Sequence, residues 1–238
     1  MNGTNECWAI IPAAGIGRRF GSGTPKQYFQ VAAKSVLQHS IDCVLSAPQI
    51  KAAVVCIAED DSFWEKQPSS QASRVHSIIG GASRAQSVSN GIEFLATKAQ
   101  VDDWVLVHDA VRPLLPEASL QNLIGHCYET QRGAILASAV VDTLKQVDAQ
   151  ERVLATLDRS SIWQAETPQM FRFGELRSAL SSALAANINI TDEASAMELA
   201  GYPIDVVASK SNNFKLTTRE DLPLLEFLMQ AKHSNIDV

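Results

Sequence analysis

Long hydrophobic runs are missing from this sequence. No apolar run approaches the roughly 20 residues that are needed to cross a bilayer. Residues 1–7 are polar and lack the basic and apolar pattern of a secretory signal. We therefore expect a cytoplasmic protein without a membrane segment.

Paired cysteines are missing as well. The four cysteines, Cys7, Cys43, Cys56 and Cys127, lie far apart and form no CxxC pair. This spacing argues against a zinc site and against a disulfide framework. We expect the cysteines to behave as small buried hydrophobic side chains.

Acidic residues are absent from residues 7–41, although the whole chain carries a formal net charge of −6. Arg18, Arg19, Lys26 and Lys34 all fall in this segment. A segment that stays cationic in an acidic protein is expected to hold a small anion. The acidic total argues against a nucleic-acid polymer as the main ligand.

Short apolar runs alternate with helical patterns along the 238 residues, of which 46% are hydrophobic and 19% charged. The runs at residues 8–11, 52–57, 104–107 and 134–137 are short enough to be buried strands. Helical spacing follows in residues 88–95 and 120–127. This alternation predicts an α/β fold with three layers, α/β/α, around a mainly parallel twisted sheet. Residues 1–238 are expected to form one domain, with the ligand beyond the carboxyl ends of the strands.

One segment breaks this alternation. Residues 141–147 and 152–157 are polar, partly alternating stretches around a turn-like sequence at 148–151. They predict a β-hairpin arm over residues 141–159. An isolated hairpin is marginally stable in water, so we expect it to pack against something else, and a second subunit is the natural candidate.

The first strand is followed by a glycine-rich loop at residues 12–27 that can approach a ligand closely and cradle phosphate oxygens. A dinucleotide fingerprint would need glycine where Phe20 stands, and no Gly-Lys-Ser/Thr is present. These departures exclude a nicotinamide dehydrogenase and a Walker-type loop. A plain flexible loop with surface cations is the alternative interpretation.

A second glycine motif occupies residues 80–88. Ser83 and Gln86 have the spacing of a capping box, which needs no function to explain it. The pair Gly80-Gly81 would permit close approach to a planar base, and Arg84 and Ser87 stand near the same helix start. We expect this motif to contact a nucleotide.

A third motif, at residues 108–113, follows the strand at 104–107. Asp109 can bind a phosphate-bridging metal or hold a sugar hydroxyl, and Arg112 can meet an anion. Asp109 could instead cap a turn. His108 is interpreted as a structural histidine, because an ionised phosphate nucleophile needs no general base.

Polar motifs continue towards the carboxyl terminus. Thr191 before two acidic residues is either a binding motif or a plain helix start. Thr218 with Asp221 is interpreted as a capping box without a catalytic role. The other motif residues are Asp142-Thr143, Asp158-Arg159, Thr167-Pro168-Gln169 and Asn213-Phe214-Lys215-Leu216-Thr217.

The spelling Ala-Ala-Gly-x-Gly-x-Arg at residues 13–19, followed by Pro-Lys, resembles the signature of the sugar-nucleotide pyrophosphorylase superfamily of nucleotidyltransferases. Within that superfamily, four patterns resemble the 2-C-methyl-D-erythritol 4-phosphate cytidylyltransferases over about residues 10–228. They are Pro-Lys-Gln-Tyr at 25–28, Gly-Gly-x-x-Arg-x-x-Ser-Val at 80–88, Asp-Ala-x-Arg-Pro at 109–113 and Thr-Asp-Glu-Ala-Ser at 191–195.

The resemblance implies a Rossmann-like nucleotidyltransferase that moves CMP from CTP to the polyol phosphate and releases pyrophosphate. It implies that Arg19 and Lys26 stabilise the transition state on the α-phosphate, and that Arg159 and Lys215 position the acceptor phosphate. CTP would be bound by Ala13, Ala14, Gly15, Gly17, Gly81, Arg84 and Ser87. The methylerythritol phosphate would be surrounded by Asp109, Arg112, Thr143, Arg159, Thr167 and Lys215.

The resemblance also implies that Mg²⁺ bridges CTP oxygens, with Asp109 as the candidate protein ligand. The hairpin would be the arm of a homodimer, which carries Thr143 and Arg159 into the partner's active site. No nucleic acid and no membrane is implied as a partner.

The sequence departs from the family pattern at two positions, and two alternative functions remain open. Val111 replaces a common alanine, and Gln86 stands where aspartate is common, which leaves fine substrate geometry undecided. A relative that cytidylylates ribitol 5-phosphate, or another pentitol phosphate, would have similar motifs. A nucleotide-sensing module without activity would have no reason to combine Arg19, Lys26, Arg159 and Lys215.

Overall fold

A seven-stranded sheet forms the centre of the computed structural model, which describes residues 5–15, 23–209 and 213–233. Its strand order is β11-β7-β10-β6-β1-β4-β5. The strands are β1 (Cys7–Pro12), β4 (Ile50–Ile57), β5 (Val75–Ile79), β6 (Trp104–Val107), β7 (Gly133–Ala139), β10 (Trp163–Arg172) and β11 (Ile204–Ala208). All four predicted strands are confirmed, with β1, β4 and β7 one to two residues longer at one or both ends.

The sheet is mainly parallel, as predicted. β1 pairs in parallel with β4 and β6, β4 with β5, and β7 with β11. β10 is the exception, because it runs antiparallel to both β6 and β7. The sequence patterns did not predict this strand, since its first residues are exposed and only its second half is buried.

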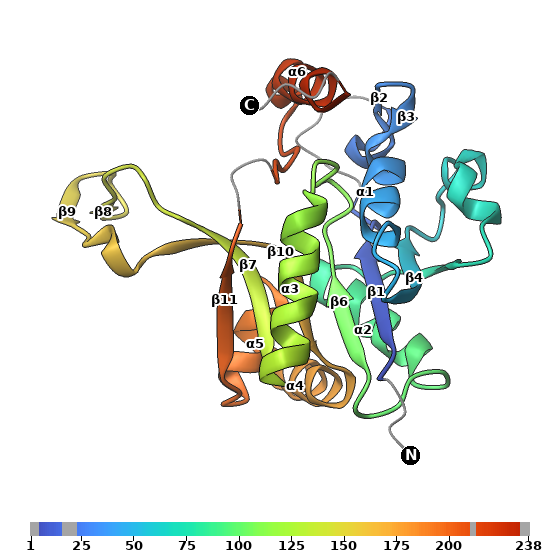
Figure 1. The fold of residues 1–238 in the computed structure, drawn as a ribbon. Helices are drawn as coiled ribbons and strands as arrows, with labels where there is room; N and C mark the ends of the chain where they lie inside the picture. The colour runs from blue at the N-terminus through green and yellow to red at the C-terminus, as the bar shows by residue number, and fades with distance from the viewer. Residues whose placement is uncertain (1–4, 16–22, 210–212, 234–238) are drawn as a thin grey trace.

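Helices cover both faces of the sheet (Figure 1). They are α1 (Val36–Leu45), α2 (Arg84–Leu95), α3 (Glu117–Thr130), α4 (Phe173–Ala185), α5 (Glu193–Leu199) and α6 (Leu222–His233). The part of the chain that the structure describes contains no helix long and apolar enough to span a membrane.

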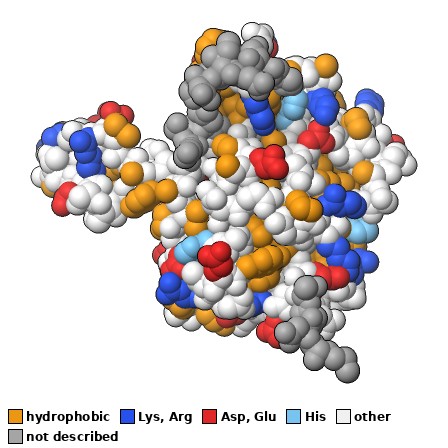
Figure 2. Space-filling model, in the orientation of Figure 1, with side chains coloured by type: hydrophobic (Ala, Val, Ile, Leu, Met, Phe, Trp, Pro, Cys, Tyr) orange, Lys and Arg blue, Asp and Glu red, His pale blue; other side chains and the backbone are white. Residues whose placement is uncertain are grey.

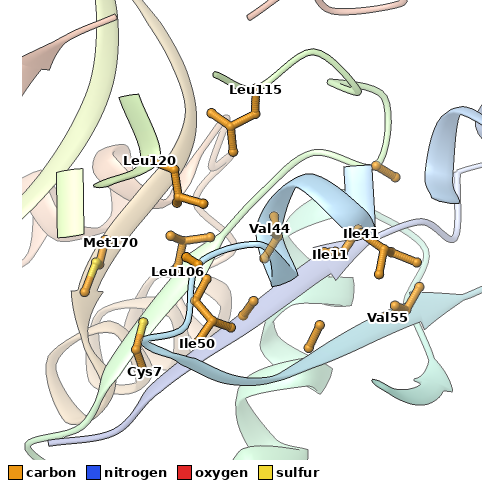
Figure 3. Packing of buried hydrophobic residues seen from close by; sticks show 14 of the residues in the cluster. Cys7, Ile11, Ile41, Val44, Ile50, Val55, Leu106, Leu115, Leu120 and Met170 are labelled. Carbon is orange, nitrogen blue, oxygen red and sulfur yellow. The ribbon is translucent and has the colours of Figure 1, made fainter. Parts of the chain in front are cut away.

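Alternate residues of β1 build the two halves of the core, because successive side chains of a strand point to opposite faces. Ala9 and Ile11 pack with α1 and α3 on one face, which Figure 3 shows around Ile41 and Leu120. Trp8 and Ile10 pack with α2, α4 and α5 on the other face. A strand that is buried on both faces explains the continuous apolar run in the sequence.

Three of the four cysteines are buried in this core, as predicted. Burial raises the pKa of the Cys56 thiol to about 12, so this side chain stays neutral. Cys43 is only partly buried.

A smaller cluster lies above the sheet, where α6 packs near two short strands, β2 (Gln30–Val31) and β3 (Lys34–Ser35). Leu225 and Met229 of α6 belong to one buried cluster with Val111, Leu114 and Leu216. α6 therefore anchors the segment around Leu216 over the loop that follows β6.

The predicted hairpin is confirmed as an arm that projects from the ends of β7 and β10 (Figure 1). It carries β8 (Lys145–Val147) and β9 (Val153–Thr156), which form a separate two-stranded sheet. Its turn is closed by Asp148, whose Oδ1 accepts hydrogen bonds from the N–H groups of Gln150 and Arg152.

The surface of the arm carries exposed apolar side chains (Figure 2), among them Val141, Val153 and Leu154, which are 80%, 63% and 61% exposed. Two-stranded sheets are marginal in water without a packing partner.

Candidate active site

Three loops meet at one edge of the sheet, because each follows the carboxyl end of a parallel strand. They are residues 13–15 after β1, residues 80–83 after β5 and residues 108–113 after β6. In open α/β sheets this edge is the usual place for ligands. The amino end of α5 and residues 213–217 complete the site.

The glycine-rich loop is held by Gln27, which lies in a short 3₁₀ helix (Lys26–Tyr28) and is 4% exposed. Gln27 Nε2 donates to the carbonyl oxygens of Ala13, at 2.7 Å, and Gly15, at 3.0 Å. The neighbouring Lys26 Nζ donates to the carbonyl oxygen of Leu216 at 3.2 Å. The loop start is therefore tied to the segment that carries Lys215.

The second glycine motif packs directly against this loop. A Cβ atom added at Gly80 would lie 2.6 Å from Ala14 Cβ, so only glycine lets the two loops approach this closely. Ser87 Oγ accepts from the Gly81 N–H at 3.0 Å and donates to the Ser83 carbonyl at 2.9 Å. These contacts shape the backbone beside the glycine-rich loop.

The predicted capping box at Ser83 is wrong in one half. Ser83 Oγ accepts from the Gln86 N–H at 3.1 Å and caps α2. Gln86 Nε2 instead donates to Asn90 Oδ1 at 3.0 Å, one helical turn further on. A polar partner on the helix surface thus competes with the backbone for this side chain.

Asp109 lies at the centre of a charged cluster and is 5% exposed. Its Oδ1 lies 3.0 Å from Arg84 Nε, and its Oδ2 lies 2.7 Å from Lys215 Nζ and 3.8 Å from Arg112 Nε. Burial alone would raise the pKa of this carboxyl, but the cations, Arg84 first, hold it well below its usual range. Asp109 is therefore ionised at all working pH values.

Glu193, at the start of α5, is a second buried carboxylate in this cluster and is 0% exposed. Arg84 Nη1 and Nη2 donate to its two oxygens at 2.7 and 2.9 Å. A bidentate pair fixes the plane of the guanidinium. Glu193 thereby sets the direction from which Arg84 approaches Asp109.

His108 is fully buried, and burial lowers its pKa to about 4, so the ring is neutral at pH 7. Its Nε2 lies 3.0 Å from the Arg112 carbonyl, which can only accept, so the proton is on Nε2. Nδ1 then accepts from the Thr167 hydroxyl at 3.2 Å, while the same hydroxyl oxygen accepts from the Asp109 N–H at 3.0 Å. Through these hydrogen bonds His108 holds the Asp109 backbone in place, which agrees with its interpretation as a structural histidine.

The segment that bears Lys215 is attached to the same loop. Arg112 Nη1 donates to the Asn213 carbonyl at 2.7 Å, and the Leu216 N–H donates to the Val111 carbonyl at 2.9 Å. The Asn213 side chain donates to Glu166 Oε2 at 2.9 Å and to the Thr167 carbonyl at 2.6 Å. Lys215 is therefore placed by contacts on both sides of it.

Two neighbouring pockets open here. The smaller, of about 210 Å³, is lined by Arg84, Asp109, Arg112, Ala165, Glu166, Thr167, Gln169, Thr191, Asp192 and Lys215. The larger, of about 790 Å³, lies between residues 138–144 at the base of the arm and the Asn213–Lys215 segment. Both are lined by Arg112, Ala165, Glu166 and Lys215.

The lining of the smaller pocket is electrically balanced, with the three cations Arg84, Arg112 and Lys215 and the three carboxylates Asp109, Glu166 and Asp192. These carboxylates do not form a metal-binding group, because among the described residues no three His, Cys, Asp or Glu side chains are placed so that they could hold a metal ion together. Asp109 does not fit the role of a Mg²⁺ ligand, because cations already contact both of its oxygens. A divalent ion at this carboxylate would be repelled by the positive charges beside it.

Comparison with known proteins decides the family. The sequence model of the protein family IspD, 2-C-methyl-D-erythritol 4-phosphate cytidylyltransferase, matches residues 7–231. The chain belongs to this family. It is similar to a protein of Pseudomonas aeruginosa with that name, with 47% identity over 220 residues that cover 92% of this chain and 94% of the relative.

Solved structures of the family agree with the fold. A crystal structure of a 4-diphosphocytidyl-2C-methyl-D-erythritol synthase superimposes with a TM-score of 0.81 at 35% identity, covering 95% of this chain and 100% of that one. The Francisella tularensis member of the family has a TM-score of 0.81 at 33% identity, covering 94% and 99%.

The structure gathers most of the residues that the family resemblance implied. Asp109, Arg112, Thr167 and Lys215 line the smaller pocket together with Arg84. Ala13, Ala14, Gly15 and Gly81 lie in the two packed loops beside it, and Ser87 lies in the first turn of α2. Gly17 and Arg19 lie outside the described residues.

Two residues of the implied site lie away from the other site residues of the same chain. Thr143 and Arg159 are exposed on the arm and line neither of the two pockets. Arg159 belongs to a short 3₁₀ helix (Arg159–Ser161), and its Nη1 donates to the carbonyl of Val141.

Arg84 also differs from expectation in its contacts. Its guanidinium engages the carboxylates of Asp109 and Glu193, and so it is part of the wall of the smaller pocket. Of the two interpretations of Thr191, the helix start is wrong, because Asp192 caps α5 in a capping box with Ser195. Asp192 Oδ1 accepts a hydrogen bond from the Ser195 N–H at the start of the helix. Thr191 lines the smaller pocket.

Sequence reasoning missed Gln27, Glu166 and Glu193 as individual site residues. Gln27 and Glu193 belong to the family motifs at residues 25–28 and 191–195, so the motifs pointed to their positions. The motifs did not predict the contacts that these two side chains make. Glu166 precedes Thr167 in an otherwise unremarked strand, and only the tertiary structure brings it to the pocket.

Proposed function

We propose that this chain catalyses the transfer of CMP from CTP to 2-C-methyl-D-erythritol 4-phosphate, which gives 4-diphosphocytidyl-2-C-methyl-D-erythritol and pyrophosphate. The observation that carries the proposal is the contact of Lys215 with Asp109 in a pocket beside the glycine-rich loop of a family member. A phosphate oxygen of the acceptor attacks the α-phosphorus, and the bond from that phosphorus to pyrophosphate breaks.

The nucleotide end of the reaction is assigned to the two packed loops. Backbone groups of Ala13, Ala14, Gly15 and Gly17 would hold phosphates, and Gly81 and Ser87 would shape the cytidine end. Arg19 and Lys26 would stabilise the negative charge that grows as pyrophosphate leaves. Such electrostatic stabilisation is the main protein contribution to transfer between phosphates.

The acceptor end is assigned to the smaller pocket. Asp109 keeps lone pairs for substrate hydroxyls even with its ion pairs, because a carboxylate can accept about four hydrogen bonds. Lys215 has a side chain that is 42% exposed, so its ammonium can also meet the acceptor phosphate. Arg112 and Thr167 complete this end.

No side chain is proposed as a general base. The acceptor phosphate is already ionised at neutral pH, and His108, the nearest imidazole in the cluster, is buried and committed to Thr167 and Arg112. Catalysis then rests on orientation and charge.

We propose that the active unit is a homodimer in which each arm reaches the partner's site, carrying Thr143 and Arg159. Charge supports this arrangement, because the balanced lining of the pocket offers no excess of cations to a dianionic phosphate. A guanidinium delivered from a second subunit would supply it. The apolar side chains exposed on the arm would be covered by the same association.

Mg²⁺ is proposed to be held by the phosphate oxygens of CTP, where it would neutralise charge and orient the triphosphate. Asp109 is not proposed as a ligand of this metal, because it is already paired with Arg84 and Lys215. Each chain would act as one domain, residues 1–238, with residues 141–159 as the arm. A cytoplasmic location remains a prediction.

The proposal is tested by measuring pyrophosphate release from each of the four common triphosphates with a panel of polyol phosphates, with and without Mg²⁺. We expect release only with CTP, methylerythritol phosphate and the metal. Faster turnover of ribitol 5-phosphate would contradict the acceptor assignment, and equal rates with all triphosphates would contradict the cytidine assignment.

A further inference from the structure

We propose that Glu166 determines acceptor specificity by accepting a hydrogen bond from a hydroxyl group of the polyol. This inference rests on the proposed function, because it names a contact to the acceptor of that reaction. None of the sequence motifs points to Glu166, and its position follows from the fold alone.

Glu166 is one of the four residues that line both pockets. It belongs to β10, whose pairing with β7 is interrupted between Ala165 and Gln169. The next residue, Thr167, belongs to the Asp109 cluster through its hydroxyl. Glu166 thus stands at the end of the pocket that faces the arm, beside the acceptor-binding group.

One oxygen of this carboxylate is already engaged. Asn213 Nδ2 donates to Glu166 Oε2 at 2.9 Å and also to the Thr167 carbonyl at 2.6 Å, so the amide holds the carboxylate in a fixed place. Asn213 is itself 4% exposed. Glu166 Oε1 accepts no hydrogen bond from any of the described residues, and the side chain is only partly buried. A fixed carboxylate oxygen without a donor suits a hydroxyl ligand.

The negative charge of Glu166 is unexpected in a pocket that is proposed to bind a phosphate. A carboxylate repels a dianionic phosphate, and here it cancels one of only three cations in the pocket lining. A residue that weakens phosphate binding in this way must favour the substrate elsewhere to be useful. A hydrogen bond from Glu166 to the hydroxyl end of the acceptor would favour the substrate in this way. An acceptor without that hydroxyl would bind more weakly, because it would leave the Glu166 carboxylate desolvated and without a hydrogen-bond partner.

The deciding experiment is the steady-state kinetics of the full-length Glu166→Gln enzyme. The glutamine carbonyl oxygen can still accept from Asn213, so the anchor is kept while the pocket loses an acceptor and a charge. If Glu166 binds a hydroxyl, KM for methylerythritol phosphate rises about tenfold, as expected for a lost charge-assisted hydrogen bond, with KM for CTP unchanged. If the charge only repels the phosphate, KM falls, so the sign of the change separates the two roles. An unchanged KM also overturns the proposal.

Two further measurements fix the interpretation. Glu166→Asp keeps the charge but withdraws the oxygen by one methylene, so it must also raise KM, and it carries the test if Glu166→Gln does not fold. Each of the three mono-deoxy analogues of methylerythritol phosphate is then assayed with the wild type and with Glu166→Gln. For one analogue the penalty of the substitution should vanish, and a penalty that is the same for all of them contradicts the contact.

Glu198→Gln is the matched control, because Glu198 is exposed on α5 and lines neither pocket. It removes the same charge and should leave both KM values unchanged. The two proposals fail separately. A wild-type enzyme that does not turn over methylerythritol phosphate contradicts the proposed function, whereas an active wild type with an unaffected Glu166→Gln variant contradicts only the role of Glu166.

Discussion

Lys215 Nζ lies 2.7 Å from Asp109 Oδ2, which joins the loop after β6 to a segment near the carboxyl terminus. Arg84, from a third part of the chain, holds the other oxygen of the same carboxylate at 3.0 Å. Asp109 is thus both a pocket residue and the charge around which three segments assemble.

Asp109→Asn is expected to abolish transfer and to destabilise the protein. Removing one partner of a buried ion pair costs about 3–5 kcal/mol, because the other charges stay buried without compensation. Urea unfolding at pH 7 measures this loss. Because the pKa of Asp109 is depressed, its stabilisation is complete above the unfolded-state value of about 3.9. The difference from wild type should therefore be the same at pH 7 and pH 5.

Asp42→Asn serves as the control for that measurement. Asp42 pairs with Lys34 on the surface, where both side chains are substantially exposed. The loss there should stay below about 1 kcal/mol. A similar loss in both variants would mean that Asp109 is no more important than a surface charge.

Lys26→Ala and Arg19→Ala should lower kcat far more than they weaken CTP binding. Each removes a cation aimed at charge that grows during transfer, a contribution worth roughly 10²–10³ in rate by analogy with oxyanion donors. Steady-state kinetics with varied CTP separates the two effects, and Lys34→Ala should behave as wild type. A change confined to KM for CTP would assign these residues to ground-state binding instead.

Mixed dimers test whether Arg159 acts on the partner's substrate. Arg159→Ala and Lys26→Ala, each inactive alone, are unfolded and refolded together, so that about half of the dimers are mixed. In each mixed dimer one site keeps both residues, and activity should return to about one quarter of the wild-type level per site. No recovery, with mixed dimers verified by mass spectrometry, would place Arg159 in its own subunit's site.

Gly80→Ala should impair the nucleotide end of the site. Its Cβ would lie 2.6 Å from Ala14 Cβ, so the two loops must separate, and we expect a higher KM for CTP and a lower kcat. Gly125→Ala is the matched control, because its Cβ meets open space on α3. There alanine should stabilise the helix by about 0.5–1 kcal/mol. Equal kinetics for the two variants would show that the close approach is dispensable.

The buried His108 should make stability depend on pH in mildly acidic solution. Burial lowers its pKa to about 4 in the folded protein, whereas the unfolded chain binds this proton near pH 6.5. The unfolded state therefore holds more protons in between, and the free energy of unfolding falls as the pH drops from about 6.5 to about 4. His108→Gln should flatten this slope, and an unchanged slope would assign it to another group.

The sequence by itself determined the layered α/β architecture, the arm and the positions of the motifs. These follow from short-range patterns, since a strand buried on both faces must be continuously apolar and a turn such as residues 148–151 is closed by its own side chains. The same locality let the motif spelling of residues 13–19, 80–88 and 109–113 indicate a nucleotidyltransferase.

Only the tertiary structure decided which polar groups neutralise one another. Asp109 could be interpreted as a metal ligand from its sequence context, but the charges of Arg84 and Lys215 already neutralise it. Glu193 and Glu166 acquired their positions from contacts with Arg84 and Asn213, which lie far away in the chain. The physical reason is that a charge inside a protein is set by its neighbours in space, through desolvation and ion pairing, and no local pattern records those neighbours.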